Sequence, residues 1–258
     1  MPELPEVETI RRQLAPHLER RTLERVEILD PRWTRPVAPE IIAEQLTGAR
    51  VERVGRAGKY LIWELDGDRH LLIHLRMTGS LLFDPAQDTP HTRARFELSG
   101  GHRLIYDDPR RFGTAHLVHG LEARQRYLTE RLGVEPFTPE FTAAHLRALA
   151  RNRTAPIKSF VLDQRKLAGV GNIYADEALF RAGIHPLRPA GQLTIRQWEA
   201  LRVAIEDALR AGIDAKGASI DDFRHVDGAR GDDRHPQRRA RRRSVRAGDR
   251  CGRPPAAR

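Results

Sequence analysis

The sequence is poor in cysteine and in long apolar runs. Cys251 is the only cysteine among 258 residues, which excludes an intrachain disulfide and any metal site built from several cysteines. No apolar stretch approaches the roughly 18 residues that cross a membrane. The N-terminal segment is acidic and lacks the basic and apolar parts of a secretory signal. We therefore expect a soluble, cytoplasmic globular protein with one or two domains.

The positive charge is concentrated at the C-terminal end. The formal net charge is +10, which favours a polyanionic partner. Residues 232–258 contain ten Arg and three Asp, so that the preceding 231 residues carry a net charge of only +3. A charge block without apolar partners is usually disordered, and we predict a disordered arginine-rich tail over 232–258. The total charge by itself is weak evidence for nucleic-acid binding.

The apolar pattern predicts a β-rich half after one N-terminal helix. Val7, Ile10, Leu14 and Leu18 recur at helical spacing and predict a helix over 5–18. Short runs rich in β-branched and aromatic residues then follow, with glycine turns at 66–67 and 100–101. Such closely spaced runs are typical of an antiparallel sandwich or barrel. The predicted strands are 51–54, 60–65, 70–75, 94–98, 103–106 and 114–118.

Beyond Gly120 the pattern becomes helical. The predicted helices are 121–132, 139–150, 156–163, 173–182 and 195–211. In the last of them, Thr194 and Gln197 fit a capping box. Its predicted buried stripe consists of Ile195, Trp198, Leu201 and Ile205.

The N-terminal string Met-Pro-Glu-Leu-Pro-Glu-Val-Glu-Thr carries the most specific chemical signal. Removal of the initiator Met would leave Pro2 with a free secondary amine, which attacks carbon only when unprotonated. The positive end of the adjacent helix disfavours the ammonium form. Glu3 and Glu6 place carboxylates within reach of such an amine. Taken alone, the string also fits an ordinary helix with an acidic first turn.

Five motifs in order resemble the formamidopyrimidine-DNA glycosylase family, and the likeness extends over about 230 residues. They are the N-terminal string, the lysine loop at 55–61, the methionine wedge at 74–80, the arginine–phenylalanine wedge at 108–113 and the hairpin at 169–175. The resemblance implies an α+β fold, in which an N-terminal antiparallel β-sandwich domain precedes a helix–two-turns–helix DNA-binding domain. It also implies domains at 1–118 and 131–231, joined by a linker at 119–130.

The resemblance assigns catalytic roles to three residues. Pro2 matches the family's Schiff-base nucleophile, Glu3 the general acid of sugar ring opening, and Lys59 the residue that assists β-elimination. The chemistry agrees, since ring opening needs a proton donor and an amine intermediate acidifies the neighbouring sugar carbon. Glu6 and Tyr174 are expected to support this site.

DNA contacts follow from the same resemblance. Met77, Arg110 and Phe112 match the residues that fill the space left by an extruded nucleotide, where an apolar wedge and a bidentate donor offset part of the cost of extrusion. Further expected DNA-binding positions are His91, Arg153 and Asn172. The duplex containing oxidised purines or abasic sites is the implied partner, in a bacterial, nucleoid-associated monomer.

The C-terminal end departs from the family pattern. The family usually ends in a four-cysteine zinc hairpin, whereas this region offers one Cys with His225 and His235 nearby. We therefore expect no metal and no cofactor. One hypothesis for the tail is a change of reading frame, which resequencing of the gene would decide. A hairpin without zinc is the other, although the tail lacks strand alternation.

The predicted function is excision of oxidised purines from DNA with cleavage of the abasic site by β/δ-elimination. The missing hairpin is expected to impair it. Two alternatives stay open: an endonuclease VIII-like glycosylase for oxidised pyrimidines, and a non-catalytic protein that binds damaged DNA. The string at residues 4–7 and the two wedges favour the purine branch.

Overall fold

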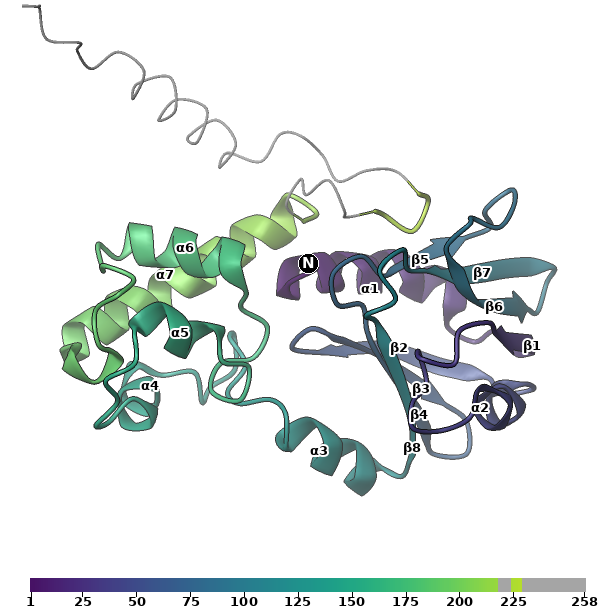
Figure 1. Cartoon of the computed structure of the whole chain (residues 1–258), viewed down its shortest axis with the longest axis horizontal. Helices are drawn as coiled ribbons and strands as arrows, with labels where there is room; N and C mark the ends of the chain where they lie inside the picture. Colours follow the sequence, from purple (N-terminus) through teal and green to yellow (C-terminus); the bar gives the residue numbers. More distant parts are fainter. Residues whose placement is uncertain (218–223, 229–258) are drawn as a thin grey trace, which may run out of the picture.

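The computed structural model describes residues 1–217 and 224–228 and divides them into a β-rich half and a helical half (Figure 1). Helix α1 (Leu4–Leu18) lies along the sandwich and begins beside the helical half. Helix α3 (Leu121–Thr129) follows the last strand, on the path from one half to the other. The α+β architecture expected from the sequence is thus confirmed. In the part of the chain that is described, no helix is long and apolar enough to span a membrane.

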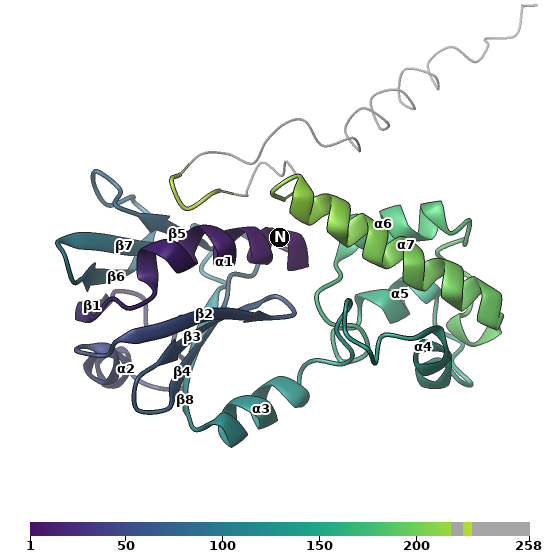
Figure 2. The same cartoon turned by 180° about the vertical axis from the view of Figure 1, so that it is seen from behind.

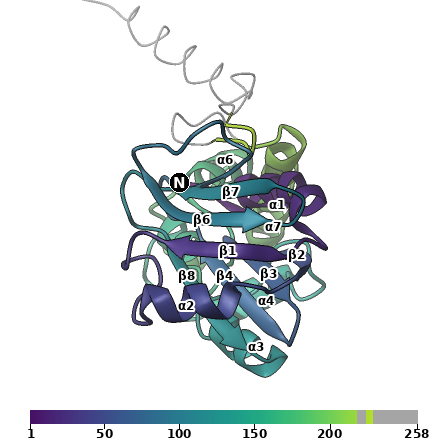
Figure 3. The same ribbon diagram turned by 90° about the vertical axis from the view of Figure 1, so that its right-hand side faces the viewer.

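The β-rich half is a sandwich of two four-stranded antiparallel sheets (Figure 3). One sheet has the order β1-β6-β7-β5 and the other the order β2-β3-β4-β8. The glycine turns at 66–67 and 100–101 join β3 to β4 and β6 to β7, as predicted. The strands are β1 (Leu23–Ile28), β2 (Val51–Ala57), β3 (Tyr60–Leu65), β4 (Arg69–His74), β5 (Ser80–Phe83), β6 (Thr92–Leu98), β7 (His102–Asp107) and β8 (Thr114–His119).

Three elements of this half were not predicted: β1, β5 and the short helix α2 (Pro39–Leu46). Strand β1 carries three charged residues among six, and only Leu23 and Val26 are buried. Strand β5 has only four residues. Both are edge strands, whose pairing depends on neighbours far along the chain rather than on local pattern.

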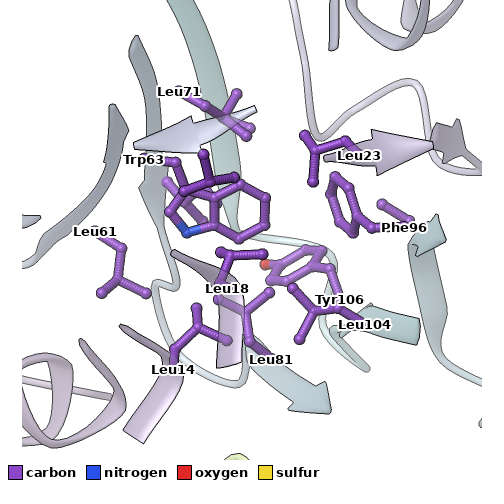
Figure 4. Close-up of a cluster of buried hydrophobic side chains, with 14 of the residues drawn as sticks. Leu14, Leu18, Leu23, Leu61, Trp63, Leu71, Leu81, Phe96, Leu104 and Tyr106 are labelled. Atoms are coloured by element: carbon purple, nitrogen blue, oxygen red, sulfur yellow. The ribbon is translucent and has the colours of Figure 1, made fainter. Parts of the chain in front are cut away.

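Leucine side chains and aromatic rings pack together in the core of the sandwich (Figure 4). Trp63 packs edge-on against Phe96 with ring centroids 5.2 Å apart. Leu14 and Leu18 of α1 enter the same cluster and are fully buried. Burial of each such side chain contributes roughly 1.5–3 kcal/mol, so the far end of α1 is firmly attached to the sandwich.

The start of α1 belongs to the other core. Leu4 packs in the helical cluster, whereas Val7, Ile10, Leu14 and Leu18 pack in the sandwich. The backbone N–H of Leu4 donates to the carbonyl of Gly169 at 3.0 Å. The first residues of the chain are therefore held at the boundary between the two halves, where Figure 1 places the N-terminus.

The helical half contains α4 (Ala143–Leu149), α5 (Ile157–Leu162), α6 (Asn172–Arg181), a 3₁₀ turn at Ala190–Gln192 and α7 (Ile195–Asp214). Thr194 and Gln197 form the predicted capping box of α7. Trp198, Leu201 and Ile205 are buried as predicted. The prediction for Ile195 is wrong, since its side chain is 43% exposed. It is the first helical residue, and the buried face of α7 begins one turn later.

Candidate active site

The carboxylate of Glu3 is enclosed by the turn that precedes α6. Glu3 is only 2% exposed. Its two oxygens accept hydrogen bonds from the backbone N–H groups of Gly171, at 2.7 Å, and Ile173, at 3.0 Å. A Cβ at position 171 would lie 2.5 Å from Oε1 of Glu3 and 2.8 Å from its Cγ. Glycine is therefore required there for the close approach, and the hairpin at 169–175 holds a side chain of the N-terminal segment.

Glu6 lies behind Glu3 and is fully buried. Its Oε2 accepts a hydrogen bond from the backbone N–H of Glu3 at 2.8 Å. Its Oε1 accepts one from the hydroxyl of Tyr174 at 2.8 Å. Two elements far apart in the sequence, the start of α1 and the first turn of α6, are thus joined through this carboxylate.

Lys59 comes from the turn between β2 and β3 and is 4% exposed. The turn is held from the helical half by Glu135. The Oε2 atom of Glu135 accepts from the backbone N–H of Gly58 at 3.0 Å, and Oε1 pairs with Arg56. Arg56 in turn donates to the carbonyl of Gly58 at 3.0 Å. The position of Lys59 therefore depends on contacts between the two halves.

Burial shifts the ionisation of both groups toward their neutral forms. It raises the pKa of Glu3 to about 7, although the positive charge of Lys59 opposes the shift. Burial also lowers the pKa of Lys59, and the charge of Arg76 adds to this effect. Near neutral pH the site thus contains a carboxyl group that is partly protonated, which is the form that donates a proton.

A cavity of about 250 Å³ opens beside Lys59. Its lining includes His74, which burial keeps neutral by lowering its pKa to about 3. Three arginines also line it, at positions 76, 131 and 165, against the single carboxylate of Asp163. This excess of positive charge suits a phosphate group.

The two wedge loops meet at the buried carboxylate of Asp108. Its Oδ1 accepts from the hydroxyl of Thr78 at 2.5 Å and from the backbone N–H of Arg110 at 3.2 Å. Its Oδ2 accepts from the hydroxyl of Tyr106 at 3.1 Å and from the backbone N–H of Gly113 at 2.9 Å. One side chain therefore orders both the loop before β5 and the loop before β8.

The wedge side chains themselves are half-buried or exposed. Met77 is half-buried, while Arg110 is exposed and Phe112 is 53% exposed. The guanidinium of Arg110 lies 4.9 Å from the centre of the Phe112 ring. These exposed side chains, on a loop that is internally well bonded, are available to contact a partner.

The structure brings together Pro2, Glu3, Glu6, Lys59 and Tyr174, all of which are buried. The other three residues predicted to contact DNA lie on the surface. His91 is exposed, and its carbonyl accepts from the N–H of Asp108 at 3.0 Å, beside the wedge. Asn172 is exposed at the first position of α6, next to Gly171. Arg153 is exposed on the helical half, after α4.

Sequence reasoning missed Asp108, Glu135 and Arg56 as organisers of these loops. Asp108 opens the 108–113 motif, so that motif could have indicated it. Nothing local marks Glu135, which lies 76 positions from Lys59 along the chain. Within residues 1–217 and 224–228, no group of three or more His, Cys, Asp or Glu side chains could hold a metal ion.

The fold and the site define a class of protein. The buried Pro2 next to an acid and a lysine, an exposed wedge and a glycine hairpin at a helix start are the features expected of a DNA glycosylase with lyase chemistry. The family model described as the N-terminal domain of formamidopyrimidine-DNA glycosylase matches residues 1–115. The model described as the H2TH domain of the same glycosylase matches residues 132–224.

Proteins similar to this chain carry the name of the glycosylase that both family models describe. The chain is 49% identical over 236 residues to the formamidopyrimidine-DNA glycosylase of Chloroflexus aggregans, covering 90% of this chain and 84% of that protein. The structure of the MutM (Fpg) protein from Thermus thermophilus is 40% identical, with a TM-score of 0.79 over 89% of this chain and 84% of that one. A Lactococcus lactis FPG mutant in complex with a Fapy-dG containing DNA is 36% identical, with a TM-score of 0.80 over 85% and 81% of the two chains. The chain belongs to the formamidopyrimidine-DNA glycosylase family.

Proposed function

We propose that this chain excises oxidised purines from duplex DNA and cleaves the resulting abasic site, with the amine of Pro2 as nucleophile. The observation that carries the proposal is the enclosure of Glu3, whose pKa of about 7 lets it keep a proton beside the start of the chain. Family membership supports the reaction type. Neither the oxidised-pyrimidine alternative nor the non-catalytic one is favoured by the relatives found.

In the first stage the Pro2 nitrogen forms a bond to C1′ of the damaged nucleotide. The N-glycosidic bond breaks, and the base leaves with the electron pair and takes up the proton that the Pro2 nitrogen loses as it becomes an imine. Glu3 donates its proton to the sugar oxygen O4′ as the C1′–O4′ bond opens. The product is a Schiff base between Pro2 and the open sugar, with the carboxylate of Glu3 held by two backbone donors.

In the second stage the positively charged imine acidifies C2′. A proton leaves C2′ and the 3′ phosphate departs, which breaks the strand; a further elimination removes the 5′ phosphate. Lys59 is suited to assist because it is buried beside the site and its pKa is lowered. The adjacent cationic cavity is suited to a backbone phosphate of the same strand.

Extrusion of the damaged nucleotide requires side chains that replace it. Phe112 and Arg110 are exposed on a loop fixed by Asp108, and Met77 lies on the loop that Thr78 ties to the same carboxylate. We assign base replacement to these three side chains, and phosphate contacts to His91, Arg153 and Asn172. On this assignment the duplex binds to the face of the protein that carries the two wedge loops.

The zinc hairpin of the family does not fit this chain, because four thiolate ligands are needed and only Cys251 is present. We propose an enzyme that works without metal or other cofactor. The tail at 232–258 lies outside the described residues, and its ten Arg are suited to diffuse attraction to phosphates. We propose domains at 1–118 and 131–231, joined by a linker at 119–130. We also propose that the protein acts in the bacterial cytoplasm, at the nucleoid.

Covalent trapping with borohydride tests the proposal. The chain with its initiator Met removed should be trapped on a duplex containing 8-oxoguanine and more weakly on one containing thymine glycol. Addition of one Gly before Pro2 should abolish trapping because it moves the amine, whereas Pro2→Gly keeps a terminal amine and should retain part of it. Arg196→Ala, a change of an exposed residue on α7, is the matched control. Undiminished trapping by the extended chain would exclude Pro2 as nucleophile.

A further inference from the structure

Gly212 occupies an unusual position in α7. It lies inside the last turn of the helix and is buried. Glycine disfavours a helix relative to alanine, because it loses more backbone freedom on folding. The common reason for glycine near a helix end is a left-handed cap. Here the positive φ angles belong to Lys216 and Gly217, beyond the end of the helix at Asp214. Gly212 therefore has another role.

The ring of Tyr174 accounts for it. Helices α6 and α7 pack side by side (Figure 2), and Tyr174 on the first turn of α6 is fully buried between them. A Cβ on Gly212 would lie 2.6 Å from Cε1 and 2.7 Å from Cζ of this ring, and closer still to its hydroxyl. Carbon atoms do not approach to such distances. The absence of a side chain at position 212 is what admits the outer end of Tyr174.

That outer end reaches the catalytic segment. The Tyr174 hydroxyl donates to Oε1 of Glu6 at 2.8 Å, and Oε2 of Glu6 accepts from the backbone N–H of Glu3 at 2.8 Å. This N–H belongs to the peptide that joins Pro2 to Glu3. The orientation of Glu6 thus helps to fix the residue whose amine is the proposed nucleophile.

We propose that Gly212 is a positioning residue for catalysis. It leaves room for Tyr174, which orients Glu6, and Glu6 holds the peptide that follows Pro2. None of these three groups is required to touch DNA. The inference rests on the proposed function, since it assigns a consequence to the placement of Pro2.

The first experiment compares Gly212→Ala with Ala211→Ser, which adds one atom on the exposed side of the same turn. Gly212→Ala should lower the single-turnover rate of 8-oxoguanine excision at least tenfold. Affinity for a duplex with an uncleavable abasic-site analogue should change less than threefold in both variants. Ala211→Ser should keep the wild-type rate. Excision by Gly212→Ala within twofold of wild type would overturn the inference.

A double-variant comparison separates this route from general damage. Tyr174→Phe removes the hydroxyl and should lower the rate about as much as Gly212→Ala does. If Gly212 acts through that hydroxyl, the double variant should be no slower than the slower single variant, whereas multiplied losses would overturn the inference.

A third experiment, in the Tyr174→Leu variant, tests the inference even if Gly212→Ala alone does not fold. Tyr174→Leu removes the ring atoms that a Cβ would meet, so adding Gly212→Ala to it should raise the midpoint of thermal unfolding. A lower midpoint would contradict the packing argument. If the wild-type chain itself cannot be trapped on damaged DNA, the proposed function fails, and this thermal comparison still tests the packing.

Discussion

The rate of base excision is expected to fall as the pH rises through about 7, because the proton that opens the sugar ring resides on Glu3. With a pKa of about 7, roughly half of the Glu3 carboxyl groups are protonated at pH 7. With the ordinary value of 4.5 the fraction would be about 0.3%. Burial of Glu3 therefore raises the proportion of competent enzyme by a factor of about 150 at neutral pH.

The assay is single-turnover excision of 8-oxoguanine from a duplex between pH 5.5 and 9. The ionic strength is fixed, because phosphate contacts make DNA binding depend on salt. The rate should fall tenfold per pH unit well above 7, as Glu3 loses its proton. Glu3→Gln should remove the excision activity over the whole range.

Two further variants test whether the alkaline midpoint reports the ionisation of Glu3. Lys59→Gln removes the positive charge that lowers the pKa of Glu3, so the alkaline midpoint should move to higher pH. Glu199→Gln is the control, at an exposed position on α7. A hydrogen bond from Arg202 lowers the pKa of Glu199, so it stays ionised throughout this pH range. The midpoint should not move in this variant. A midpoint that is unchanged in Lys59→Gln, or that falls, would refute the reasoning.

Four other outcomes are expected. The raised pKa of Glu3 means that the folded state binds this proton more tightly than the unfolded state, so stability is lost as the pH rises from 4.5 through about 7. Glu3→Gln should accordingly stabilise the fold by about 1–3 kcal/mol at pH 8 and by much less at pH 5, as measured by thermal unfolding. Equal effects at both pH values would contradict the raised pKa of Glu3. Gly171→Ala should displace the Glu3 side chain and reduce excision at least tenfold, as measured by borohydride trapping; full trapping would show that the close approach at 171 is dispensable. Phe112→Ala should slow excision from a duplex at least tenfold while unfolding changes by less than about 0.5 kcal/mol, because the ring is 53% exposed; a large loss of stability would identify Phe112 as a core residue instead. Deletion of residues 232–258 should weaken binding to undamaged DNA at low salt. The slope of the log binding constant against log salt concentration should become shallower by about 0.9 for each phosphate that the tail neutralises. An unchanged slope would mean that the tail does not bind phosphates.

Local pattern was sufficient for much of the fold. The spacing of Val7, Ile10, Leu14 and Leu18 predicted α1, since an apolar stripe at helical period must face a core. The turn pairs Asp66-Gly67 and Gly100-Gly101 placed two hairpins correctly, and Thr194 with Gln197 marked the start of α7. The motifs, through their resemblance to a family, indicated the residues at the centre of the site. These features depend on a few consecutive residues, and the sequence displays them directly.

Tertiary structure decided what those residues can do. The raised pKa of Glu3 arises from enclosure by a turn about 170 positions away, and the place of Lys59 from a carboxylate at Glu135. The exposure of Ile195 likewise depends on where the surface that α7 packs against ends. The edge strands β1 and β5 depend on their partners β6 and β7, which come later in the chain. Ionisation and packing are set by distances in space and by the exclusion of water. Residues remote in the chain determine both, and no local pattern records which of them will meet.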